Sequence, residues 1–211
     1  MQTIETFQPL IRSLAGDPDG KRYDDAMLQL AMRTAMREYD AFLPNLHEVS
    51  LPQKAVHGRT LMLDWQPESH QRLAAIRWTD AAGRLVTPAF QLFLTESGCQ
   101  LETDTPIPLS ATSQVTLLIQ QPHTLAGLDG ELTTTLPERD TLLLAQGAAG
   151  HAMRIRAASV TEVFGKRPED GASLLRQAQT MLDSFRNSLT ILSQNSGSAP
   201  LPAFPRKGFP V

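Results

Sequence analysis

Apolar residues recur every three or four positions along residues 23–42, and this spacing predicts an amphipathic helix. The acidic residues at its start suit the first turn, where the helix dipole favours negative charge. A shorter apolar pattern over residues 7–14 predicts an earlier helix. The run Gly16-Asp17-Pro18-Asp19-Gly20 predicts the turn between the two. The stripe of the longer helix is formed by Leu28, Met32, Ala35, Tyr39 and Phe42.

The pattern changes over residues 46–136, where short β-prone segments alternate with proline, glycine, aspartate and serine clusters. This rhythm predicts an antiparallel, β-rich domain of the sandwich or barrel type. Pro88 predicts an edge strand or a bulge, because proline cannot donate a hydrogen bond to a central ladder. The expected strands are residues 46–51, 59–65, 72–78, 85–94, 99–103 and 115–120.

Helical patterns return after residue 136. The phrase Thr135-Leu136-Pro137-Glu138 has capping-box spacing with a proline near the first turn, so a helix is expected to begin there. It continues through residues 142–164, although Gly147 and Gly150 lower the helix propensity. Two interpretations stay open: one helix whose small residues admit a close neighbour, or two shorter helices joined by a kink. A last helix is predicted over residues 169–194, with the stripe Leu174, Ala178, Met181, Phe185, Leu189 and Leu192.

These elements predict an α+β protein. Residues 1–45 and 137–195 are expected to form a small helical bundle, with residues 46–136 as an inserted β-rich domain. The stripes of residues 23–42 and 169–194 are expected to face each other, and burial of each large apolar side chain contributes roughly 1.5 to 3 kcal/mol. Residues 196–211 lack periodicity and are expected to be an extended C-terminal arm. The arm residues expected to bind a partner are Leu201, Phe204, Phe209, Arg206 and Lys207.

Composition narrows the possible partners. The chain of 211 residues is 41% hydrophobic and 19% charged, as in ordinary folded proteins. Its formal net charge of -3 provides no basic field for binding nucleic acid or an anionic membrane. No signal peptide or membrane-spanning run is visible. The single cysteine, Cys99, cannot form an internal disulfide and is expected to be a small buried hydrophobic residue in a protein that folds in a reducing cytoplasm.

Residues able to carry chemistry are scattered. The run Asp17-Pro18-Asp19-Gly20 faintly resembles a calcium loop, but Lys21 and Leu28 stand where oxygen ligands are needed, so a turn is favoured. No glycine-rich phosphate loop is present, and Cys99 lacks a signature for an activated thiolate. The histidines form no zinc pattern; His57 and His70 flank one predicted strand and could meet in space, but separate structural or surface roles are favoured. The chain is therefore not expected to be an enzyme or to bind a cofactor or metal; its histidines are His47, His57, His70, His123 and His151.

Several arginines and a lysine lie in the helical segments near the C-terminus. Arg154 and Arg156 fall in an otherwise apolar stretch, which suggests a carboxylate partner for them, although a structural role is favoured. The basic residues around the last helix are more often a solvated face than a binding site; they are Lys166, Arg167, Arg176 and Arg186.

Several phrases together resemble structural proteins of tailed bacteriophages and prophages. They occur in the same order as in that group and span roughly residues 10–190. The order of helices, β module and helices is also similar to head-tail adaptor proteins. The phrases are Tyr23-Asp24-Asp25-Ala26-Met27-Leu28 with Ala35 and Tyr39, Pro122-His123-Thr124-Leu125-Ala126-Gly127-Leu128-Asp129-Gly130, Thr133-Thr134-Thr135-Leu136-Pro137, and Gly147-Ala148-Ala149-Gly150.

The resemblance implies a head-tail connector of the virion. It implies a homo-oligomeric, twelve-fold ring below the portal, assembled in the bacterial host cytoplasm, with the tail segment of each subunit inserted into the portal. Portal protein and tail or connector proteins are the implied partners. DNA would pass through the ring without sequence-specific binding, and no membrane is involved.

Two alternatives stay open at this point. The first keeps the phage setting and makes the chain a tail-completion or terminator subunit. The second makes residues 46–136 a non-catalytic module that binds a glycan or a peptide, with Trp65 and Trp78 as its large aromatic platforms.

Overall fold

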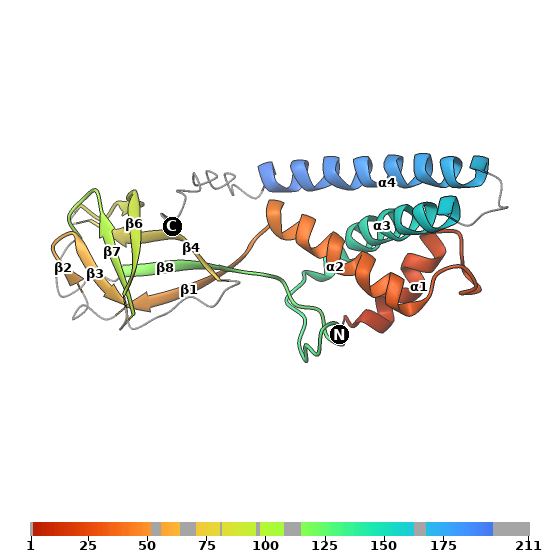
Figure 1. The fold of residues 1–211 in the computed structure, drawn as a ribbon. Coiled ribbons are helices and arrows are strands. Elements are labelled where there is room, and N and C mark those ends of the chain that lie inside the picture. Colours follow the sequence, from red (N-terminus) through yellow and green to blue (C-terminus); the bar gives the residue numbers. More distant parts are fainter. Residues whose placement is uncertain are drawn as a thin grey trace, which may run out of the picture. The chain divides into compact units, whose positions relative to one another are not determined.

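Four α-helices and two antiparallel sheets make up the regular structure of the part of the chain that is described (Figure 1). The computed structural model describes residues 2–51, 56–63, 71–80, 82–95, 98–107, 115–162 and 168–195. The chain divides into a helical unit, Met1–Pro44 with His123–Val211, and a β-rich unit, Asn45–Pro122. The predicted α+β class is confirmed.

The helical unit contains α1 (Ile4–Leu14), α2 (Asp25–Phe42), α3 (Thr141–Glu162) and α4 (Pro168–Asn195). The Asp24 carboxylate caps α2 by accepting a hydrogen bond from the Met27 backbone N–H at 2.7 Å. The helix expected near residue 135 begins as a 3-10 turn, η2 (Glu138–Asp140), and continues directly into α3. None of the described helices is both long enough and apolar enough to span a bilayer.

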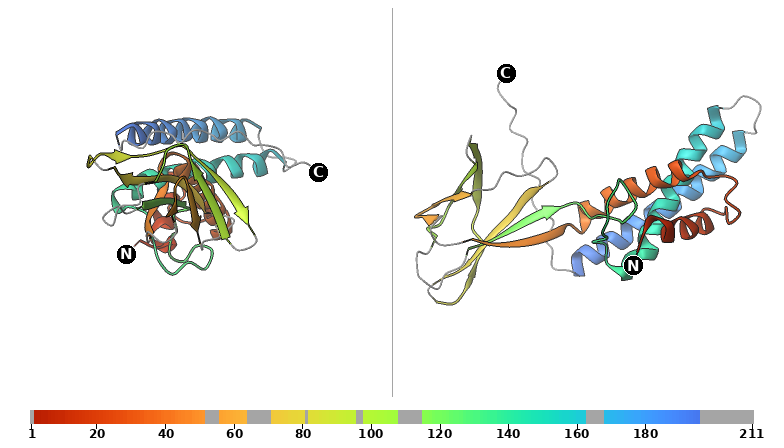
Figure 2. Two further views of the ribbon diagram at one scale, coloured as in Figure 1. Left: turned by 90° about the vertical axis from the view of Figure 1, so that its left-hand side faces the viewer. Right: turned by 90° about the horizontal axis from the view of Figure 1, so that it is seen from below.

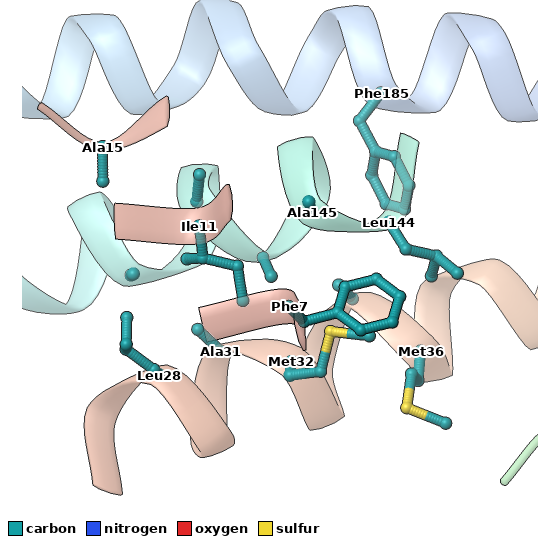
Figure 3. Packing of buried hydrophobic residues seen from close by; sticks show 14 of the residues in the cluster. Phe7, Ile11, Ala15, Leu28, Ala31, Met32, Met36, Leu144, Ala145 and Phe185 are labelled. Atoms are coloured by element: carbon teal, nitrogen blue, oxygen red, sulfur yellow. The ribbon is translucent and has the colours of Figure 1, made fainter. Parts of the chain in front are cut away.

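Helix α3 is the centre of the helical unit. It packs against α1, α2 and α4, whereas α2 and α4 touch each other only slightly (Figure 1). The expectation that the stripes of α2 and α4 face each other is therefore corrected, because each stripe packs mainly on α3. Apolar residues surround α3 on most sides, as is typical of a helix buried among others. Figure 3 shows this core, with Phe7 and Ile11 from α1, Ala31 and Met32 from α2, Leu144 and Ala145 from α3, and Phe185 from α4.

Small residues let α4 approach α3 closely. Ala145, Ala148, Ala149 and Ala152 of α3 are fully buried. A Cβ atom added to Gly147 would lie 2.8 Å from the Phe185 ring, and one added to Gly150 would lie 2.9 Å from Leu182. The structure thus decides between the two interpretations of residues 142–164: α3 is one continuous helix, and its glycines admit a close neighbour.

Residues 123–136 form a strap, an irregular segment that belongs to the helical unit. Its residues Leu125, Leu128 and Leu136 are buried in the helical core. The Ile4 backbone N–H donates to the Ala126 carbonyl oxygen at 2.9 Å, which ties the strap to the start of α1. The β-rich range expected over residues 46–136 is accordingly longer than the β-rich unit, which ends at Pro122.

The β-rich unit consists of two four-stranded sheets, which Figure 2 shows from two further directions. Both sheets contribute to one apolar core, which includes Leu61, Ile76, Leu101 and Leu117. This shared core is that of a sandwich. The first sheet has the order β1 (Asn45–Leu51), β8 (Val115–Gln121), β4 (Arg72–Thr79), β5 (Leu85–Val86), and the second has the order β2 (Val56–His57), β3 (Thr60–Leu63), β7 (Gly98–Thr103), β6 (Phe90–Thr95).

The strands at which the chain enters and leaves this unit are neighbours. β1 and β8 pair antiparallel over their full lengths, from Asn45 opposite Gln121 to Leu51 opposite Val115. The segment expected as one strand over residues 85–94 is divided into β5 and β6, and Pro88 lies in the interruption. The two-residue strand β2 was not predicted.

Substitution of Gly147 tests the close packing of α3 and α4. We expect Gly147→Ala to lower the free energy of unfolding by up to about 2 kcal/mol, because overpacking costs about 1 to 3 kcal/mol and alanine's helix propensity returns about 1 kcal/mol. Denaturant unfolding measures the change. Phe185→Leu removes the ring that the new methyl group meets, so Gly147→Ala should cost less in that background. An equal loss in both backgrounds would contradict the packing described.

Candidate functional site

The residues expected to bind a partner lie outside the described residues. Leu201, Phe204, Arg206, Lys207 and Phe209 all follow α4, the last helix described. The structure therefore leaves their role as a prediction.

Cys99, His47 and His57 lie on three different strands of the β-rich unit. Cys99 is fully buried on β7, as expected, and burial raises the pKa of its thiol. His47 lies on β1 and His57 on β2, while His70 lies outside the described residues. Among the residues that the structure describes, no three His, Cys, Asp or Glu side chains gather where they could hold a metal ion.

Asp17 anchors the turn between α1 and α2. Its side chain is only 3% exposed, and its carboxylate accepts hydrogen bonds from the backbone N–H groups of Lys21, Arg22 and Tyr23 at 2.9, 2.9 and 3.0 Å. Burial acts to raise the pKa of Asp17, but these donors and the Arg12 guanidinium outweigh it, so the pKa is lowered. The Asp17 carboxylate, part of the run that resembles a calcium loop, thus stabilises its own turn through backbone hydrogen bonds.

Tyr23 is buried beneath an arginine from α3. Arg156 lies over the Tyr23 ring with its Cζ atom 5.5 Å from the ring centroid, and it donates a hydrogen bond to the Arg22 carbonyl oxygen. The described contacts of Arg156 are with an aromatic face and a backbone carbonyl, as the favoured structural role implies, and not with a carboxylate. Arg154, two positions earlier on α3, is exposed. These contacts hold the loop after α1 against α3.

A polar cluster joins the end of α2 to the start of the strap and to η2. The Asp40 Oδ1 atom lies 2.6 Å from the His123 Nδ1 atom and accepts the His123 backbone N–H at 3.1 Å. The Tyr39 hydroxyl donates to Asp140 Oδ2 at 2.7 Å, and the Tyr39 ring meets the His123 ring edge-on with centroids 5.2 Å apart. Burial, and then the bond to Asp140, raise the pKa of Tyr39, so its hydroxyl keeps the proton that it donates.

A second polar cluster joins three helices. Glu38 of α2 accepts two hydrogen bonds from Arg186 of α4, and the Glu38 Oε1 atom lies 3.4 Å from the Nε2 atom of His151 on α3. Burial acts to raise the pKa of Glu38, but the bond to Arg186 and the nearby positive charges outweigh it and lower this pKa. Arg186, expected on a solvated face, therefore has a defined acidic partner.

The phrases that carry the phage resemblance occupy positions that fix the helical unit. Asp24 caps α2, and Tyr23 lies beneath Arg156. Gly127 adopts a positive φ of 81° where an added Cβ would lie 2.9 Å from Ile4 Cγ2. Gly147 and Gly150 admit α4. The described residues of these phrases thus contribute to the capping and packing of the helical unit.

A glycan-binding module needs an aromatic ring with an exposed face, and Trp78 does not provide one. This side chain is only 3% exposed and belongs to the core of the β-rich unit. A sugar stacks on an aromatic ring only where the ring face is accessible. Trp65 lies outside the described residues, so the part of this alternative that rests on Trp65 stays a prediction.

Comparison with known proteins places the chain in no family. No protein-family model matches the sequence, and no curated protein matches it. Among solved structures, the chain is similar to a chain from the neck of an empty GTA particle, a structure computed with C6 symmetry. The two chains share 15% identity over 82% of this chain and 89% of that chain, with a TM-score of 0.28. A TM-score this low does not indicate a shared fold.

Removal of the Tyr39 hydroxyl tests the first polar cluster. We expect Tyr39→Phe to lower the free energy of unfolding by about 1 to 3 kcal/mol, because it leaves the buried Asp140 carboxylate without this donor. Tyr23→Phe is the matched control, since Tyr23 is equally buried and no hydroxyl hydrogen bond is described for it. Denaturant unfolding of both variants should show the larger loss for Tyr39→Phe, and equal losses would contradict the role assigned to the bond.

Proposed function

We propose that this chain is a structural protein of a tailed-phage particle and forms the head-to-tail adaptor ring that joins the portal to the tail. The observation that carries the proposal is the chain order: both ends of the chain build one helical unit, and the β-rich unit is inserted between Pro44 and His123. This is the organisation that the resemblance to head-tail adaptors implies.

The positions of the resembling phrases support the same proposal. They recur at a helix cap, in the strap and at the closest contact of α3 with α4, so the similarity follows the residues that shape the helical unit. A protein that acts by presenting rigid surfaces needs such residues and needs no catalytic centre. Structural binding, without enzymatic activity, is therefore the proposed mode of action.

The proposed ring is homo-oligomeric and twelve-fold, with portal protein and tail or connector proteins as partners. Residues 196–211 are proposed as the arm that docks on the portal, through Leu201, Phe204 and Phe209 with the positive charges of Arg206 and Lys207. An arm that gains order on docking binds without a preformed pocket, at the cost of its conformational entropy. The proposed location is the head-tail interface of the virion, after assembly in the bacterial host cytoplasm.

Truncation tests the arm. We expect deletion of residues 197–211 to leave the thermal unfolding of the described helices and sheets unchanged and to abolish incorporation into heads that carry the portal. The matched control keeps the length and composition of residues 197–211 but reverses their order, and it should also fail to join. Normal assembly of the truncated protein would refute the arm proposal.

Cryo-electron microscopy of the assembled particle tests the position. An adaptor is expected directly below the portal, as a ring closed by heterologous contacts that has the symmetry of the portal. A hexameric ring at the end of the tail tube would instead identify a tail-completion or terminator subunit and overturn the adaptor proposal. Native mass spectrometry with and without the portal protein should show a ring that forms only on its partner.

A further inference from the structure

His151 is a buried ionisable residue where three helices meet. It lies on α3, is only 1% exposed, and has its Nε2 atom 3.4 Å from Oε1 of Glu38 on α2. Neither of its ring nitrogens has a hydrogen-bond partner among the described residues. Buried polar atoms are usually hydrogen-bonded, so an imidazole in this state requires an explanation.

The nearest carboxylate is already occupied. Arg186 of α4 donates from Nη2 to Glu38 Oε1 at 2.9 Å and from Nε to Glu38 Oε2 at 3.1 Å, a two-point contact typical of strong arginine pairs. This pair links α2 directly to α4, two helices that otherwise pack mainly on α3. A protonated His151 would approach the same oxygen, Oε1, and would repel the Arg186 guanidinium, because the single negative charge of Glu38 cannot balance two positive charges.

The two basic residues differ in their freedom to move. The Arg186 side chain is 38% exposed, and its Nη1 atom already lies 3.9 Å from Oδ1 of Asp183 on the same helix. Arg186 can therefore leave Glu38 and keep a negatively charged partner. His151 is enclosed by the core and has Glu38 as its one described acidic neighbour. A positive charge on His151 would thus be balanced only by Glu38.

Charged groups around His151 come from each helix that contributes to the cluster. They are Glu38 on α2, Arg186 on α4 and Arg154 on α3 itself. Burial lowers the pKa of His151, and the two arginines lower it further, while Glu38 acts in the opposite direction. Because the folded-state pKa lies below the unfolded value, His151 favours the fold above about pH 6.5, and this contribution is lost as the pH falls.

We propose that His151, Glu38 and Arg186 form a proton-operated exchange of ion pairs. At neutral pH Glu38 pairs with Arg186 and links α2 to α4. At acidic pH His151 takes up a proton from solvent, its Nε2–H donates to Glu38 Oε1, and Arg186 turns to Asp183. The link between α2 and α4 is then released, and the part of α4 from Arg186 to Asn195 loosens on α3. This exchange does not depend on the adaptor role.

Hydrogen exchange of the full chain tests the proposal. Amide protection in α4 is compared at about pH 7.5 and about pH 5, after correction for intrinsic exchange rates. We expect α4 near Arg186 to lose protection about fivefold at the lower pH, as loss of about 1 kcal/mol of pairing energy requires. The loss should reverse when neutral pH is restored. Unchanged protection of α4 across this interval would overturn the proposal.

Variants separate this exchange from general acid destabilisation. Glutamine at position 151 cannot titrate, so His151→Gln should abolish the loss of α4 protection at acidic pH. His47→Gln, the same change at an exposed residue of β1, should retain this loss. Arg186→Gln should lower the amide protection of α4 to the same extent at both pH values. A loss at acidic pH that persists in His151→Gln would refute the mechanism.

Nuclear magnetic resonance tests the proposal on the wild-type protein and so does not depend on whether any variant folds. The imidazole signals of the wild-type protein report the protonation of each histidine, and His151 should titrate together with the signals of the Arg186 side chain. A His151 ring that remains neutral throughout the interval in which α4 loosens would overturn the proposal, because the loosening would then have another cause.

Discussion

The close contact between α3 and α4 is the constraint on which the rest of the helical unit depends. Gly147 and Gly150 remove the side chains that would otherwise separate the two helices, so Phe185 and Leu182 pack directly on the α3 backbone. The buried alanines of α3 likewise carry only small side chains in the core that α3 shares with α1 and α2. Apolar area leaves water on several sides of a single helix, and dense packing makes each added methyl group costly. α3 is therefore the central helix on which α1, α2 and α4 all pack.

Polar contacts then select one arrangement among those that apolar packing allows. The Asp40–His123 pair fixes the start of the strap on α2, and the Tyr39–Asp140 bond fixes η2, from which α3 continues. The Glu38–Arg186 pair fixes the position of α4 relative to α2. Each of these contacts joins residues far apart in sequence, so each is satisfied only when the whole unit has formed. Burial makes such contacts specific, because a partly satisfied buried group is expensive.

Periodicity was sufficient to predict the four helices and most strands, since α2 and α4 carry regular stripes and the β-rich segments are separated by turn residues. It could not predict which helices would touch. Two good stripes suggested that α2 and α4 face each other, but the nearly uniform apolar character of α3 makes it the better partner for both. The strap was assigned to the β-rich domain because its residues lack helical spacing, although Leu125 and Leu128 reach the helical core through irregular backbone. The polar clusters were equally hidden, because Glu38 and His151 are 113 positions apart and only the fold brings them together.

The pairing of β1 with β8 has a consequence for how this architecture can vary. Asn45 and Gln121 are opposite each other in the ladder, so the β-rich unit begins and ends within one strand spacing, roughly 5 Å. A tight turn of about two residues would close that gap. The insertion can therefore be exchanged for another sandwich, or lost altogether, without changing the separation of the two chain ends that emerge from the helices. Such a junction makes the chain modular: lineages could diversify the inserted unit while the helical scaffold stayed the same.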